Sequence, residues 1–472
     1  MQGTRQPPDS PPVAASVAVE AAHTGIPGRS HTGKRCVRAR GRAPSGPASV
    51  AGVSIAISST AAPKGLPIHK LSLPGTRALT IMVAFDAGSR SERPEENGIA
   101  HFLEHLVFKG GEKYPHYRDV NGTAERMGGM LNAFTSQDLV AFHITVRAER
   151  APEALDLLTD FVGRPHIDVD ELDKERGVVI QEIQRADDQP SSVAGDLIDK
   201  AAFGDHPLGR TILGPEEHLR TFTRDQIVAF RDRQWAPSRG GAYLVGNLEH
   251  LPEDAALGEL FDRFPAPAKP ESNLTFPQLT PRTLIEKRDT NQSHLRITYQ
   301  PQIDAANARE RAALRLYGSI LGGSMSSRLF DELREQRGLC YSVWGYEHVH
   351  ADGAQLSLGA GLESAKTGEA YTRMREIVNE MRTGGITADE LELARAYASG
   401  RHILATESSG AVARLAASQS IIFEEEINPD RVIDLIDSIT LDEVNEIAQR
   451  VPDEAAVACV GPHEADEFDW SA

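Results

Sequence analysis

The segment Asn97-Gly-Ile-Ala-His-Phe-Leu-Glu-His-Leu-Val-Phe-Lys-Gly110 carries two histidines four residues apart. In an α-helix of 3.6 residues per turn, His101 and His105 project from the same face. Their imidazoles can then bind one metal ion, while Glu104 stands beside them as a carboxylate free to move a proton. This order of residues is the inverted form of the His-Glu-x-x-His zinc helix and indicates a hydrolase active site.

The ends and the apolar face of this segment predict a helix. Asn97 is a good N-cap, and Gly110-Gly111 follow as a C-cap should. One face is apolar and would be buried; it comprises Ile99, Phe102, Leu103, Leu106 and Val107. The alternative is two chance histidines on an amphipathic helix, so the metal interpretation depends on a third ligand.

A second segment offers that ligand, because a catalytic zinc takes three protein ligands and keeps a fourth position for water. The stretch Asp170–Arg185 has a helical pattern, charged at its start and apolar near Val178 and Ile183. Glu175 and Glu182 lie seven residues apart in it and therefore on one face. A carboxylate from this helix would complete the site, although a charge run on a helix is more often a solvated surface.

Together these residues resemble the pitrilysin and insulinase family of metallopeptidases, most closely its short-chain branch with the mitochondrial processing peptidase and its bacterial relatives. The resemblance implies one Zn²⁺ per chain, held by His101, His105 and Glu182. It implies Glu104 as the general base and Glu175 as a supporting carboxylate. It also implies that the peptide lies extended along an edge strand near four consecutive residues, which are Asn132, Ala133, Phe134 and Thr135.

The second half of the chain adds a further match. Its segment Leu321–Ser342 is similar to the family's C-terminal signature, which implies that Arg334 and Tyr341 face the zinc across the substrate chamber. A guanidinium and a phenol there would orient a peptide carbonyl and stabilise the oxyanion formed as water attacks. Outside the family context, a surface arginine and a core tyrosine would be the plainer interpretation.

Internal repeats indicate that the two halves share one topology. Three pairs of segments correspond: Asp170-Glu171-Leu172 with Asp389-Glu390-Leu391, Thr223-Arg224-Asp225 with Thr440-Leu441-Asp442, and Ile81–Phe85 with Arg296–Tyr299. The same alignment sets the three zinc ligands opposite Leu314, Gly318 and Arg401, so the second half is expected to have no metal site. The predicted fold is α+β, with two homologous halves, each an antiparallel sheet covered by helices. As in this family, they would form half of a clamshell.

The predicted boundaries follow composition. Residues 66–264 form the catalytic half, a Pro-rich linker spans 265–284, and 285–470 form the non-catalytic half. Residues 1–60 are rich in Ala, Pro, Gly and Ser and have seven Lys or Arg against two acids. They are expected to be a disordered extension or to follow from a start codon placed too far upstream. An organellar transit peptide is the alternative, which leaves bacterial cytoplasm and mitochondrial matrix open as locations.

Composition limits the partners. The net charge of −18 opposes binding to nucleic acid, and no apolar run is long enough to span a bilayer. Cys36, Cys340 and Cys459 are far apart, which indicates a reducing compartment without a disulfide framework.

The expected function is a zinc metalloendopeptidase acting on unfolded peptides or presequence-like segments. Because the family's short chains resemble half of a closed chamber, a homodimer or a heterodimer with a related subunit is implied. Two alternatives stay open: a catalytic subunit active only with a separate partner, and a scaffold protein with a vestigial site.

Overall fold

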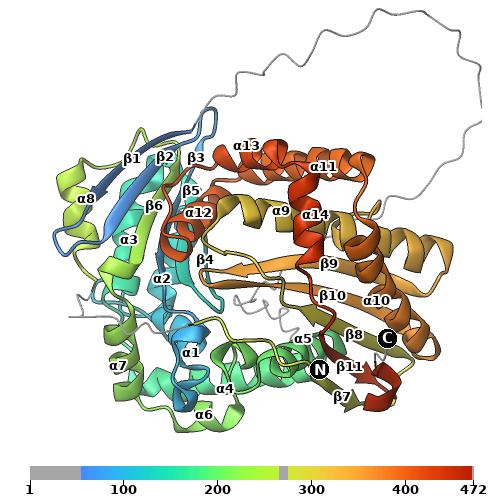
Figure 1. Cartoon of the computed structure of the whole chain (residues 1–472). Helices are drawn as coiled ribbons and strands as arrows, with labels where there is room; N and C mark the ends of the chain where they lie inside the picture. The colour runs from blue at the N-terminus through green and yellow to red at the C-terminus, as the bar shows by residue number, and fades with distance from the viewer. Residues whose placement is uncertain (1–54, 265–274, 470–472) are drawn as a thin grey trace, which may run out of the picture. The chain divides into compact units, whose positions relative to one another are not determined.

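The computed structural model describes residues 55–264 and 275–469, which contain two β-sheets with helices around them (Figure 1). The first sheet has the order β1-β2-β6-β3-β5-β4. Its strands are β1 (Ala56–Ala61), β2 (Pro67–Ser72), β3 (Ala78–Phe85), β4 (Met130–Thr135), β5 (Val140–Arg147) and β6 (Gly240–Gly246). The apolar run of β3 is buried on both faces, as a central strand requires. β4 is an edge strand, and no strand within residues 55–264 and 275–469 pairs with its outer side.

The second sheet has the order β7-β11-β8-β10-β9. Its strands are β7 (Thr283–Lys287), β8 (Gln292–Tyr299), β9 (Cys340–His350), β10 (Gly353–Glu363) and β11 (Ala456–Gly461). The pairing repeats that of β2-β6-β3-β5-β4 strand for strand. The pairs are antiparallel, as expected, apart from one parallel pair in each sheet, β2 with β6 and β7 with β11.

The helices follow the same duplication. The first half contains α1 (Ile99–Val107), α2 (Tyr117–Arg126), α3 (Ala151–Gly163), α4 (Val169–Asp187), α5 (Pro190–Phe203), α6 (Glu216–Thr221), α7 (Arg224–Gln234) and α8 (Asp254–Phe261). The second contains α9 (Ala308–Gly318), α10 (Thr367–Gly384), α11 (Ala388–Thr406), α12 (Ser409–Ala417), α13 (Arg431–Ser438) and α14 (Leu441–Gln449). Thr223 and Thr440 begin α7 and α14 with the same capping box, which explains their repeated sequence.

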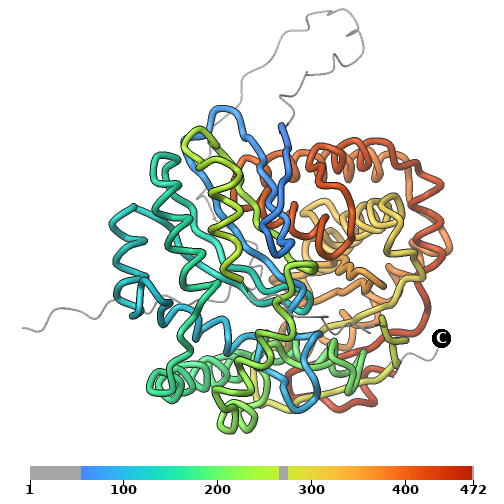
Figure 2. The backbone as a smooth tube through the Cα atoms, turned by 90° about the vertical axis from the view of Figure 1, so that its left-hand side faces the viewer, coloured from blue at the N-terminus to red at the C-terminus, as the bar shows by residue number. Residues whose placement is uncertain are grey.

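The two halves exchange a helix across their sheets. Helix α5 packs its Ile198 and Ala202 against Ala456 and Ala458 of the second sheet. Helix α12 lies on β3 and β6 of the first sheet, and the orange part of the chain that contains it runs beside the blue strands in two views (Figure 1, Figure 2). Each sheet therefore packs against a helix from the other half, so the two halves share buried surface at α5 and α12.

Strands β1 and β7 correct the predicted boundaries at two places. Strand β1 begins at Ala56, before the expected start at residue 66 and inside the extension assigned to 1–60. Its side chains are mostly exposed and ladder bonds to β2 hold it, so its composition gave no signal. Strand β7 begins at Thr283, inside the predicted linker 265–284. Residues 1–54 of the extension and 265–274 of the linker lie outside the described residues.

Candidate metal centre and active site

Helix α1 is short, and its position depends on packing. It has nine residues, fewer than an isolated helix needs for stability in water. Its apolar face, including Phe102, Leu103 and Leu106, is fully buried in the first core. This packing fixes the neighbouring face, which carries His101 and His105. The expected ends are corrected: the N-cap is Gly98 rather than Asn97, and the helix ends at Val107 before Gly110.

The structure brings the three predicted ligands together. Nε2 of His105 lies 3.5 Å from Oε2 of Glu182, and Nε2 of His101 lies 3.8 Å from the same oxygen. One ligand atom from each of the three residues lies within 4.8 Å of the others. Glu182 comes from α4, which packs against α1. Two imidazole nitrogens and one carboxylate oxygen are the donor set of a catalytic zinc site, so these residues fit that metal.

Glu175 lies about two helical turns before Glu182 on α4 and supports the centre from there. Its Oε1 lies 3.0 Å from Nδ1 of His105, and its other oxygen pairs with Lys109. A carboxylate on Nδ1 fixes the ring orientation and leaves Nε2 free to bind a metal. Glu175 therefore has the geometry of a supporting carboxylate.

The pKa values of the two histidines are shifted in opposite directions. Burial lowers the pKa of His101 to about 4, and His105 beside it adds to this effect. Burial alone would also lower the pKa of His105, but hydrogen bonds to Glu175 and Glu182 outweigh it and raise the pKa to about 9. Burial alone would raise the pKa of Glu182, but its hydrogen bond to His105 and the charges of both histidines outweigh burial and lower the pKa. The carboxylate is thus held as an anion, the form that binds metal.

Glu104 stands beside the three ligands and is held by the edge strand. Oγ1 of Thr135, at the end of β4, donates a 2.6 Å hydrogen bond to Oε2 of Glu104. Burial raises the pKa of Glu104, and the Thr135 hydrogen bond lowers it in part. A carboxyl group with a raised pKa is suited to exchange protons near neutral pH. The other three residues of the predicted binding strand, Asn132, Ala133 and Phe134, precede Thr135 on β4.

Arg334 and Tyr341 lie together but apart from this centre. The Arg334 guanidinium stacks 5.5 Å from the Tyr341 ring, which is 79% exposed. No hydrogen bond, ion pair or ring contact within residues 55–264 and 275–469 joins either side chain to the histidines. Tyr341 is the second residue of β9, whereas the far end of β9, at His350, is the end that contacts the first half through Asp138.

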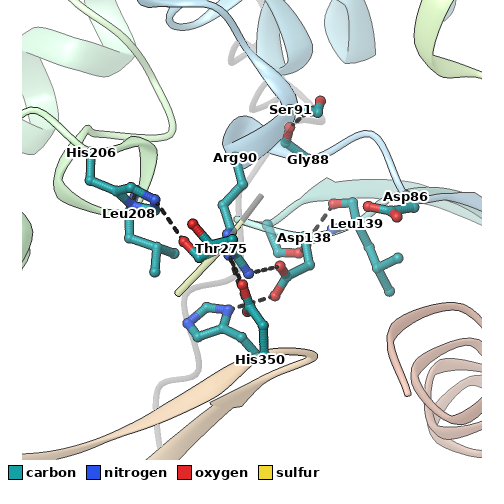
Figure 3. Close-up of polar contacts among 12 residues, drawn as sticks. Asp86, Gly88, Arg90, Ser91, Asp138, Leu139, His206, Leu208, Thr275 and His350 are labelled. Atoms are coloured by element: carbon teal, nitrogen blue, oxygen red, sulfur yellow. Dashed lines mark hydrogen bonds and ion pairs between the residues drawn. The ribbon is translucent and has the colours of Figure 1, made fainter. Parts of the chain in front are cut away.

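Sequence reasoning missed a polar cluster between the halves. Nη1 of Arg90 donates to Asp138 at 2.9 Å, and Nη2 reaches Asp352 at 3.0 Å. Nδ1 of His350 lies 2.8 Å from the second oxygen of Asp138, so that carboxylate is flanked on both sides (Figure 3). Asp138, His348 and His350 also have ligand-type atoms within 4.8 Å of one another. Because both oxygens of Asp138 already have partners, we interpret the cluster as an ion-pair junction.

Comparison with known proteins agrees with this geometry. Residues 70–216 match the family described as "Insulinase (Peptidase family M16)", and residues 221–397 match "Peptidase M16 inactive domain". The uncharacterized zinc protease YmxG of Bacillus subtilis is 32% identical over 82% of this chain and 94% of its own length. The chain belongs to the insulinase family, peptidase family M16. The second match begins inside the first half, because α7, β6 and α8 lie after residue 221.

Other relatives of the M16 chain are bacterial as well. An uncharacterized zinc protease of Streptomyces coelicolor is 31% identical over 83% of this chain and 86% of its own. Among solved structures, a peptidase M16 inactive domain from Pseudomonas fluorescens superposes with a TM-score of 0.78 at 18% identity, over 87% of this chain and 99% of that one. A protease from Helicobacter pylori gives 0.77 at 21%, over 87% and 100%. These structures confirm the predicted fold.

Proposed function

We propose that this M16 chain is a zinc metalloendopeptidase that hydrolyses unfolded peptides or presequence-like segments. One observation carries the proposal: His101, His105 and Glu182 converge on one point, with Glu104 beside them at the end of a free edge strand. The zinc proteases among its relatives support the same chemistry by name. We assign one Zn²⁺ to each chain.

Each residue has a distinct part in this reaction. His101, His105 and Glu182 would hold the zinc ion, which when bound would act as a Lewis acid toward water and the peptide carbonyl. Glu104 accepts the proton of the attacking water and later gives it to the leaving amine. Thr135 holds the Glu104 carboxylate in place through its hydrogen bond.

The peptide would bind to β4 as an added strand. Main-chain groups on the outer side of β4 can pair with an extended peptide. Thr135 is the last residue of β4 and bonds Glu104, so a peptide paired with the end of this strand would lie beside Glu104. Such binding uses backbone groups common to all peptides, so selection by sequence would be loose. A peptide must be extended to bind in this way, and this requirement favours unfolded substrates.

We propose a dimer in which Arg334 and Tyr341 of one copy serve the zinc site of the other. Tyr341 and His350 are nine positions apart on β9, or about 30 Å of extended strand. His350 contacts the turn after β4, and the rest of β9 runs away from α1 (Figure 1). A partner chain is therefore the simplest way to bring a phenol and a guanidinium to the carbonyl. Because this chain has both sets of residues, we favour a homodimer over a heterodimer.

Zinc content and cleavage of a quenched basic peptide by wild type and Glu104→Gln test the proposal. We expect zinc in both proteins and cleavage only by the wild type, since glutamine cannot accept the proton. Wild type that binds zinc without cleaving would support the alternative of a separate partner subunit. Absence of zinc in both would overturn the metallopeptidase proposal and favour a scaffold with a vestigial site.

The bacterial relatives favour the bacterial cytoplasm over the mitochondrial matrix as the location. Among the described residues, the structure has no helix long and apolar enough to cross a membrane. Cys340 and Cys459 are free thiols, as a reducing compartment allows.

A further inference from the structure

The N-terminus of the zinc helix lacks a capping side chain of its own. The N-cap of α1 is Gly98, with φ at +97° and no side-chain cap. A Cβ at this position would lie 2.6 Å from the carbonyl oxygen of Leu213, so only glycine fits. The first amide groups of α1 therefore need an acceptor from elsewhere in the chain.

Glu92 supplies that acceptor from outside the helix. Its Oε2 accepts 3.0 Å hydrogen bonds from the Gly98 amide and the Asn97 side chain, and its Oε1 accepts a 2.9 Å bond from the Ala100 amide. The Glu92 residue is 4% exposed, and Arg210 donates to its backbone oxygen. Burial raises the pKa of Glu92 to about 8, although these hydrogen bonds and the charge of Arg210 oppose the shift. Ala100 directly precedes the zinc ligand His101.

Two residues before Glu92, Arg90 makes the contact to the second half. Its guanidinium, in a residue 3% exposed, bridges Asp138 of the β4–β5 turn and Asp352 of the β9–β10 turn. Figure 3 shows Arg90 directed at Asp138, with His350 on the other side of that carboxylate. The backbone of Arg90 also donates to Gln137 at 2.8 Å. Arg90 is therefore held by both halves.

We propose that the segment Arg90–Glu92 sets the zinc affinity of the centre. Glu92 is a positioning residue that fixes the first turn of α1, and Arg90 is the link through which the second half supports it. The inference rests on the proposed zinc site. Core packing holds the apolar face of α1, whereas Glu92 holds the amides of its first turn, so a loss of these anchors lets His101 move relative to Glu182. Partners bonded directly to metal ligands change metal affinity by about 10–100-fold, and Glu92, which bonds the backbone beside His101, should act at the lower end of this range.

Zinc affinity of the full chain, measured by competition with a chromophoric chelator, tests this directly. Glu92→Gln should weaken zinc binding by about tenfold or more, because an amide nitrogen replaces one acceptor oxygen. Glu95→Gln is the matched control, since Glu95 is exposed on the same segment. Glu92→Asp keeps the carboxylate and should recover part of the affinity. A folded Glu92→Gln protein with wild-type zinc affinity would overturn the role of Glu92.

A variant in the second half tests whether Arg90 transmits support from that half to the zinc site. Asp352→Asn should weaken zinc binding by several-fold, although Asp352 contacts neither α1 nor α4 through any described bond. Asp289→Asn, an exposed position in the β7–β8 turn, should have no effect. Equal zinc affinity of Asp352→Asn and wild type would remove the second half from the inference. A wild type that binds zinc but cleaves nothing contradicts the proposed function alone, so the two failures are distinguishable.

Discussion

Oγ1 of Thr135 donates a 2.6 Å hydrogen bond to Oε2 of Glu104, which ties the last residue of the edge strand to the carboxylate beside the metal ligands. The bond joins the element proposed to bind the peptide to the group proposed to move the proton. A substrate strand added to β4 would thus end next to the base. Such positioning raises the reaction rate because the base and the peptide bond are already held in the reactive geometry.

Thr135→Val should lower kcat/KM by about 10–100-fold, the value of a hydrogen bond to a charged group. Because this bond lowers the pKa of Glu104, its loss should also move the acidic limb of the kcat/KM profile to higher pH. Thr135→Ser keeps the hydroxyl and should behave as wild type. An unchanged acidic limb in Thr135→Val would show that the bond does not tune the base.

Glu175→Gln should weaken zinc binding by about 10–100-fold, because the amide no longer anchors Nδ1 of His105 as a carboxylate does. The same change removes the anion paired with Lys109. Glu171→Gln, near the start of α4, is the control and should leave zinc affinity unchanged. Competition with a chelator measures the zinc affinity of both variants. If Glu175→Gln binds zinc as tightly as Glu171→Gln, Glu175 has only a structural role.

Mixing two inactive variants tests the proposed dimer. Glu104→Gln lacks the base and Tyr341→Phe lacks the phenol, but a mixed dimer would contain one site with both. We expect about a quarter of wild-type activity after equal amounts are mixed and allowed to exchange subunits, as random pairing predicts. If Tyr341 serves the zinc site of its own chain, the mixture will show only the summed activity of the separate variants.

Ile198→Ala should lower the free energy of unfolding by about 2–5 kcal/mol, although Ile198 lies on a helix of the first half. Its side chain is buried against the second sheet, so both halves should lose stability in one transition. Ile403→Ala, at a residue 47% exposed, should change stability by less than about 0.5 kcal/mol. Two separate unfolding transitions by calorimetry would contradict the shared core.

The buried side chain of His143 should lower the free energy of unfolding in acid. Burial lowers its pKa to about 4, and Arg414 adds to the shift. Between pH 6.5 and about 4 the unfolded chain binds a proton there that the folded chain does not, so folding stability falls as the pH falls through this range. His143→Gln should lose less stability than wild type between pH 7 and 4.5 in urea titrations. Parallel curves for the two proteins would exclude His143 as a contributor.

Local patterns in the sequence predicted much of the fold. The predicted helical pattern Asp170–Arg185 lies within α4, and the repeated segment Ile81–Phe85 lies within strand β3. Strand β1 was missed because its residues are exposed and only ladder bonds hold it. The parallel pairing of β2 with β6 was missed because partners so distant in sequence leave no local signal.

The sequence by itself determined the local chemistry. A period of 3.6 residues places His101 and His105 on one face of a helix, with Glu104 beside them, and sets Glu175 and Glu182 on one face of another. Only the tertiary structure decided that α4 meets α1, that Thr135 bonds Glu104, and that Arg90 joins two turns 214 residues apart at Asp138 and Asp352. Helical periodicity is a property of neighbouring residues, whereas these contacts depend on which buried faces pack together across the whole chain.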